Sequence, residues 1–135
     1  MKNAEKTRKW LKRAKSNLAC TKVGKVSPEI LYEDLCFDAQ QAVEKALKAL
    51  CIRHGIVFRR THDIAYLIEI LEKGKVNVPE DIQRSKLLTD YAVETRYPGD
   101  YPSVDEEAYK EALEIAERVV NWVEREIGDN EQSSP

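Results

Sequence analysis

The chain has 135 residues, of which 42% are hydrophobic and 34% are charged, and its net charge is −2 at pH 7. This composition argues against a disordered chain, and the length predicts one domain over residues 1–128 with a polar tail over 129–135. A general nucleic-acid binder would be clearly basic. Residues 2–25 nevertheless carry far more base than acid, which fits either a solvated helix face or a phosphate-binding surface.

The three cysteines, Cys20, Cys36 and Cys51, are an odd number without CxxC spacing. Together with a polar start that lacks a signal peptide, they predict a reducing, cytoplasmic setting. Each lies in a helical apolar pattern and is expected to be a small core residue rather than part of a metal cluster. No stretch of about 18 apolar residues is present, so no membrane span is expected.

Helix start and stop signals divide the chain into five predicted helices, over 4–23, 28–54, 63–73, 80–95 and 104–127. Ser27 before Pro28 is typical of a helix start, and Ser103 with Glu106 forms a predicted capping box. Trp10 is expected on the inner face of the first helix. The short connections predict an all-α fold, an up-and-down bundle of about five antiparallel helices.

The second predicted helix carries two apolar stripes, which indicate a central helix packed on more than one side. The first stripe is Leu31, Leu35, Ala39, Ala42, Ala46 and Leu50. The second is Tyr32, Cys36, Val43 and Leu47.

A polar strip interrupts this helix at Gln40, Gln41, Glu44, Lys45 and Lys48. The pairs 40–44, 41–45 and 44–48 are each four residues apart, so each pair shares a helix face. The strip is either a polar flank with ordinary pairs, the lining of a groove, or a dimer interface.

The segment Thr61-His62-Asp63-Ile64 is typical of a helix start, with Thr61 or Asp63 as the cap. A catalytic His–Asp pair would need a nucleophile, and no Gly-x-Ser-x-Gly context is present. A zinc site would need three or four ligands at recognisable spacing, which the two histidines do not supply.

The segment from Arg96 to Tyr101 contains a predicted turn at Pro98 and Gly99. Tyr97 and Tyr101 beside Arg96 form either a surface for base stacking and phosphate contact or a turn anchored by an arginine–carboxylate contact.

Segments 38–50, 61–64 and 96–98, in this order, closely resemble the HEPN domain family (higher eukaryotes and prokaryotes nucleotide-binding). Trp10, Leu11, Ala14 and Leu18 are similar to the first helix of that family. The resemblance covers residues 5 to 127 and implies a bundle of four to five helices, usually a homodimer, in a small prokaryotic cytoplasmic protein. It also implies a gene beside a minimal nucleotidyltransferase, often as a toxin–antitoxin system. Some members are metal-independent ribonucleases, and others bind nucleotides or present substrate to the nucleotidyltransferase.

The resemblance implies that the ribonuclease members of the family carry an Arg followed, after four to six residues, by a His. Positions 47–49 and 55–57, upstream of His54 and His62, contain no arginine, and positions 101–103, downstream of Arg96, contain no histidine. A tyrosine with an ordinary pKa of about 10 is a poor proton acceptor at neutral pH, so Tyr101 does not replace the missing histidine. The leading hypothesis is therefore a non-catalytic protein that binds a nucleotide or RNA, or docks a nucleotidyltransferase. No cofactor and no metal are expected.

A phosphate needs converging cations or helix N-terminal amides, and the start of the third helix at 61–63 is expected to offer such amides. The expected ligand contacts are Gln41, Lys45, Lys48, His62, Asp63, Arg96 and Tyr97. One alternative is a divergent metal-independent HEPN ribonuclease toxin that uses Arg96 with Tyr101 or His62. The other is a purely structural dimerisation module.

Overall fold

The structure, a computed structural model, describes residues 2–92 and 104–132. Its elements are α1 (Lys2–Val23), α2 (Tyr32–Arg53), α3 (Ile64–Lys73), α4 (Glu80–Gln83), the 3-10 helix η1 (Arg84–Ala92) and α5 (Glu106–Gln132). The described residues form no strand, so the predicted all-α class is confirmed.

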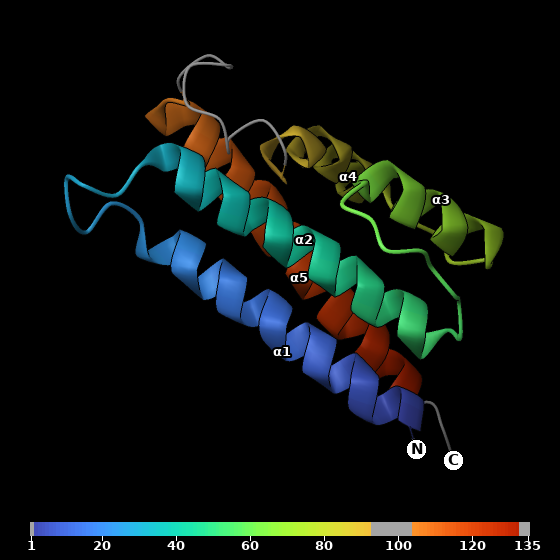
Figure 1. The fold of residues 1–135 in the computed structure, drawn as a ribbon. Coiled ribbons are helices and arrows are strands. Elements are labelled where there is room, and N and C mark those ends of the chain that lie inside the picture. Colours follow the sequence, from blue (N-terminus) through green and yellow to red (C-terminus); the bar gives the residue numbers. More distant parts are fainter. Residues whose placement is uncertain (1, 93–103, 133–135) are drawn as a thin grey trace.

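The three long helices lie side by side, with α2 in contact with both α1 and α5 (Figure 1). Helix α1 is antiparallel to α2, as predicted for neighbours. Helices α2 and α5 begin at the same end of the molecule and run in the same direction (Figure 1). The reason is that α3, α4 and η1 lie between them in the sequence and carry the chain back, with α3 and η1 in contact with α2.

Helix α2 is the centre of the core, as its two apolar stripes predict. Leu47 and Leu50 are completely buried, and so are the alanines of the same helix, Ala39, Ala42, Ala46 and Ala49. Small side chains let neighbouring backbones approach closely, so the leucines fill the space that remains between the helices.

The start of the second helix was predicted too early. Ser27 Oγ accepts a hydrogen bond from the Glu29 amide at 3.2 Å, and the Ser27 carbonyl accepts one from the Ile30 amide at 3.1 Å. Ser27 and Pro28 therefore form a turn, for which both residues are equally suited. Leu31, placed in the buried stripe by its spacing, precedes the helix and is 51% exposed.

The fourth and fifth helices also differ from their predicted bounds. The fourth is a single α-helical turn that continues as η1. Asp105 Oδ1 accepts a hydrogen bond from the Ala108 amide at 2.8 Å, so Asp105 caps the start of α5. The predicted capping residue, Ser103, lies outside the described residues. Helix α5 continues to Gln132, into the predicted tail, because a glycine at 128 lowers helix propensity without ending the helix.

Two of the three cysteines lie in the core as predicted. Burial raises the pKa of the Cys36 and Cys51 thiols to about 12, so both remain protonated at neutral pH. Cys20 is exposed on α1, and its assignment to the core was wrong. None of the helices among the described residues is long and apolar enough to span a bilayer.

Candidate functional site

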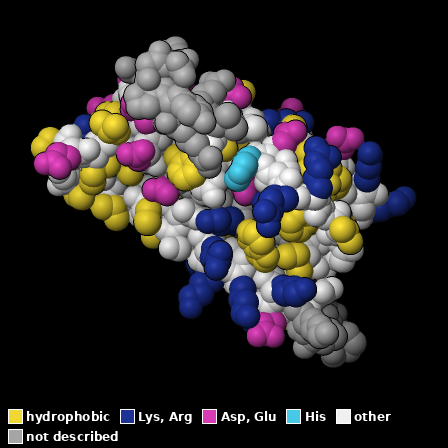
Figure 2. All heavy atoms as spheres, in the orientation of Figure 1, with side chains coloured by type: hydrophobic (Ala, Val, Ile, Leu, Met, Phe, Trp, Pro, Cys, Tyr) yellow, Lys and Arg dark blue, Asp and Glu magenta, His cyan; other side chains and the backbone are white. Residues whose placement is uncertain are grey.

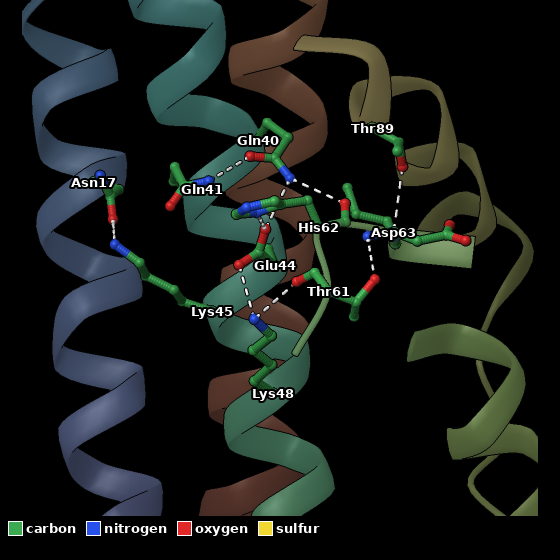
Figure 3. A network of polar contacts seen from close by, with 11 residues as sticks. Asn17, Gln40, Gln41, Glu44, Lys45, Lys48, Thr61, His62, Asp63 and Thr89 are labelled. Carbon is green, nitrogen blue, oxygen red and sulfur yellow. Dashed lines mark hydrogen bonds and ion pairs between the residues drawn. The ribbon is translucent and has the colours of Figure 1, made fainter. Parts of the chain in front are cut away.

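Glu44 is the centre of a buried polar network on α2 (Figure 3). Its Oε2 accepts a hydrogen bond from Lys48 Nζ at 2.9 Å, and its Oε1 accepts one from Gln40 Nε2 at 3.1 Å. His62 Nδ1 lies 2.7 Å from the same Oε1. The Glu44 side chain is only 4% exposed, so these three donors replace the water that the carboxylate loses.

The segment 61–62 closes over this network. Lys48 Nζ donates to the Thr61 carbonyl at 3.0 Å, and Gln40 Nε2 lies 3.4 Å from the His62 carbonyl oxygen. Gln40, Glu44 and Lys48 are at most 6% exposed as a result. These three residues of the strip therefore face neither an open groove nor a second subunit, since the same chain covers them.

The network fixes the ionised form of Glu44. Burial acts to raise the pKa of the carboxyl, but the hydrogen bonds from Lys48, His62 and Gln40 and the charge of Lys48 outweigh it and lower the pKa below its ordinary value. The result is a buried anion that holds a lysine and a histidine in fixed positions.

His62 is the exposed end of the network, with a side chain that is 50% exposed. Its Nδ1 is occupied by Glu44, so Nε2 is the ring nitrogen left to contact a ligand. A histidine whose one nitrogen is held by a carboxylate presents the other in a defined orientation.

The start of α3 is capped by Asp63, whose Oδ1 accepts a hydrogen bond from the Tyr66 amide at 3.3 Å. This confirms the predicted helix start. The Asp63 amide donates to Thr61 Oγ1 at 3.0 Å, and the Ile64 amide donates to Thr89 Oγ1 at 3.2 Å. Of the amides at 61–63 that were predicted to face a phosphate, that of Asp63 is therefore already bonded within the chain, and the Asp63 carboxylate is engaged as the cap.

Gln41 and Lys45 do not form the pair that their spacing predicts. Gln41 Nε2 donates to Gln40 Oε1 at 2.7 Å, and Lys45 Nζ donates to Asn17 Oδ1 on α1 at 2.8 Å. Burial lowers the pKa of Lys45. The negative charge of Glu44 raises the pKa of Lys45, and the positive charge of Arg13 lowers it further. Lys45 and Arg13 are thus neighbouring cations on the α1 side of α2.

Sequence reasoning missed a set of aromatic side chains around Lys48. Its Nζ lies 5.5 Å from the ring centroid of Trp10 and 5.8 Å from that of Phe58, and the two rings meet edge to face at 6.5 Å. Trp10 is not confined to the inner face of α1. Its side chain also lines a surface depression of about 280 Å³ with Lys9 and Arg13. The sequence feature that indicates this depression is the presence of Lys9 and Arg13, four residues apart on a helix, beside Trp10.

These cations belong to a wider surface. Figure 2 shows Lys and Arg side chains gathered around an apolar area, with a His side chain at its edge. We define the basic face as Lys9 and Arg13 of α1, which line one depression with Trp10, together with Lys45 of α2, which lies near Arg13, and His62.

The remaining predicted site residues, Arg96, Tyr97 and Tyr101, lie outside the described residues. Among the side chains that the structure does describe, no three His, Cys, Asp or Glu converge in a way that could hold a metal ion.

Comparison with known proteins identifies the class. Residues 7–126 match the HEPN domain, so the chain belongs to the HEPN domain family, as the sequence resemblance implied. A protein of Methanocaldococcus jannaschii, described as "Putative toxin MJ1304", is 28% identical over 144 aligned residues that cover 93% of each chain.

Two solved structures are similar to this chain. The archaeal HEPN homologue ST0689 is 31% identical with a TM-score of 0.71, over 90% of this chain and 97% of its own. TT1696 from Thermus thermophilus is 34% identical with a TM-score of 0.75, over 88% and 96% respectively.

Proposed function

We propose that this HEPN protein is a non-catalytic RNA- or nucleotide-binding component of a prokaryotic, cytoplasmic toxin–antitoxin-like system, and that the basic face contacts phosphates. The observation that carries the proposal is that buried Glu44 holds the exposed His62 ring at 2.7 Å, while the next residue of α2, Lys45, lies near Arg13 of α1. A fixed imidazole and converging cations are what a phosphate group requires.

The electrostatics of the basic face support an anionic ligand. Lys45 is half-buried, and Arg13 beside it disfavours its charged form. A phosphate between these two cations would relieve that repulsion. Lys9 makes a solvent-exposed ion pair with Glu5 at 3.7 Å, a contact that water screens and that a phosphate can replace.

The partners we propose are a second copy of the chain and a minimal nucleotidyltransferase, both implied by the sequence resemblance. The name of the Methanocaldococcus jannaschii relative adds support for a toxin-like role. Sedimentation of the purified protein tests the homodimer, and co-purification with a nucleotidyltransferase encoded beside its gene tests the second partner.

Replacing Lys9 and Arg13 together by alanine is expected to weaken binding of a short single-stranded RNA. Each phosphate contact to a single strand contributes about 0.7 to the slope of log K against log salt, so losing two contacts should reduce the slope by about 1.4. Fluorescence anisotropy of labelled RNA over a salt series measures both the affinity and the slope.

The matched control is Lys73→Ala. Lys73 is an exposed lysine on α3 that pairs with Glu69, so its removal subtracts a surface charge elsewhere in the fold. If Lys73→Ala lowers the slope as much as a single substitution at Lys9 or Arg13, binding is a response to net charge and the basic face is not the site.

A second function, cleavage of RNA without metal, has one observation in its favour. His62 is held by Glu44 in the way that a carboxylate orients a general base. Our proposal expects total RNA to stay intact with excess protein in EDTA, as judged by gel electrophoresis. Cleavage that disappears in His62→Ala would establish the ribonuclease alternative instead.

A further inference from the structure

A second surface depression adjoins the one that Lys9 and Arg13 line, since Trp10 lies in both. It has a volume of about 530 Å³ and lies between the start of α1 and the segment that follows α2. Its walls are the rings of Trp10 and Phe58 and the side chains of Ile52, Ile56 and Val57, with Lys6 and Asn3 at the α1 side. Val57 is 90% exposed, so the apolar wall continues to the open surface.

We propose that this depression, called here the Trp10 pocket, binds an unpaired nucleobase of a single-stranded RNA whose phosphates lie on the basic face. The inference rests on the proposed function and names the part of the RNA that the apolar surface recognises. Aromatic side chains bind bases of any sequence, because every base has a π face for stacking.

The positive charges around the pocket favour binding of a polyanion over binding of an uncharged ligand. Lys6 lies in the pocket itself, and Trp10 also lines the neighbouring depression with Lys9 and Arg13. A base that stacks on Trp10 would therefore have cations on both sides for the phosphates that flank it. This alternation of aromatic and basic side chains is typical of single-strand binding surfaces.

The buried network holds the aromatic walls in place. Lys48 is fixed by Glu44 and the Thr61 carbonyl, and its ammonium group lies within 6 Å of both ring centroids, at 5.5 Å from Trp10 and 5.8 Å from Phe58. Cation–π attraction at such distances favours this arrangement of the rings. The same carboxylate thus orients His62 on one side and, through Lys48, the pocket on the other.

The test compares two strands with the same phosphates. One is an oligo(A) of about twelve nucleotides, a length that covers a typical single-strand site, and the other is the matching abasic strand. Trp10→Ala is expected to weaken oligo(A) binding about tenfold, the effect of losing one stacked base, and to leave the abasic strand unchanged. Trp10→Phe, which keeps a ring, should retain most of the affinity.

Tyr32→Ala is the matched control, because Tyr32 is an aromatic residue at the opposite end of α2, stacked on Tyr109 at 5.4 Å. It should bind both strands as the wild type does. The ratio of the two affinities within each variant keeps the result independent of any loss of folded protein.

The two proposals fail in different ways. If Trp10→Ala weakens both strands equally, the pocket does not bind a base, while the basic face remains a phosphate site. If the wild type binds neither strand, the proposed function is wrong, and so is the proposal that the Trp10 pocket binds a nucleobase. If polyglutamate displaces oligo(A) from the wild type but not from Trp10→Ala, the pocket serves an acidic protein, and the nucleobase proposal is wrong.

Discussion

Glu44→Ala is expected to lower the free energy of unfolding by about 3–5 kcal/mol, the cost of breaking a buried ion pair by removing one partner. The reason is that Lys48, whose side chain is only 7% exposed, would lie in the core without the carboxylate that neutralises it. Gln40 would lose the same acceptor, and His62 would lose the contact that orients it. Urea denaturation at neutral pH, followed by circular dichroism, measures the change.

The chain contains a matched control for this experiment. Glu69 and Lys73 form the same pair, four residues apart on a helix, at 3.2 Å, but their side chains are 62% and 73% exposed. Glu69→Ala is expected to change the free energy of unfolding by less than about 1 kcal/mol. Equal effects of the two substitutions would show that the buried network adds nothing net to stability.

A double variant separates loss of the pair from loss of a buried charge. Adding Lys48→Met to Glu44→Ala removes the unpaired ammonium and keeps an apolar chain of similar length beside Trp10. Part of the lost stability should return. If Lys48→Met makes the single variant less stable still, the ammonium contributes through Trp10 and Phe58 rather than through Glu44.

The sequence predicts the contacts of this site that lie along α2, but not those that the 61–62 segment makes. The spacing of Gln40, Glu44 and Lys48 places them on one helix face, and the two pairs that it predicts are formed in the structure. What the spacing does not predict is that the 61–62 segment packs over that face. Residues four apart on a helix meet because of helix geometry alone, whereas a contact across a loop depends on how the whole chain packs.

The fold shows the same division. Apolar periodicity predicts the helices, because burying one stripe is what stabilises each of them. The ends of the helices are less well predicted, because the same short sequence pattern can form either a turn or a helix cap. Ser27 accepts its amide hydrogen bond within a turn, where a helix cap was expected. In η1, Ser85 and Leu88 are both buried, and a spacing of three residues keeps side chains on one face in 3-10 and α-helices alike, so periodicity does not distinguish between the two.

Leu50→Ala is expected to lower the free energy of unfolding by about 2–5 kcal/mol. Leu50 is completely buried on the helix that contacts both α1 and α5. Removing its side chain leaves a cavity between helices that cannot all close in to fill it, so the loss exceeds the transfer free energy of the missing methyl groups. Thermal and urea denaturation at one protein concentration measure the loss.

Leu31→Ala is the comparison that separates the structure from the sequence pattern. Spacing alone assigns Leu31 and Leu50 to one buried stripe, and therefore predicts similar losses. The structure places Leu31 before α2 with 51% of its surface exposed, so its truncation should change the free energy of unfolding by about 0.5 kcal/mol or less. A loss at Leu31 as large as that at Leu50 would mean that this leucine is buried in the protein in solution, either by an earlier start of α2 or by a second copy of the chain.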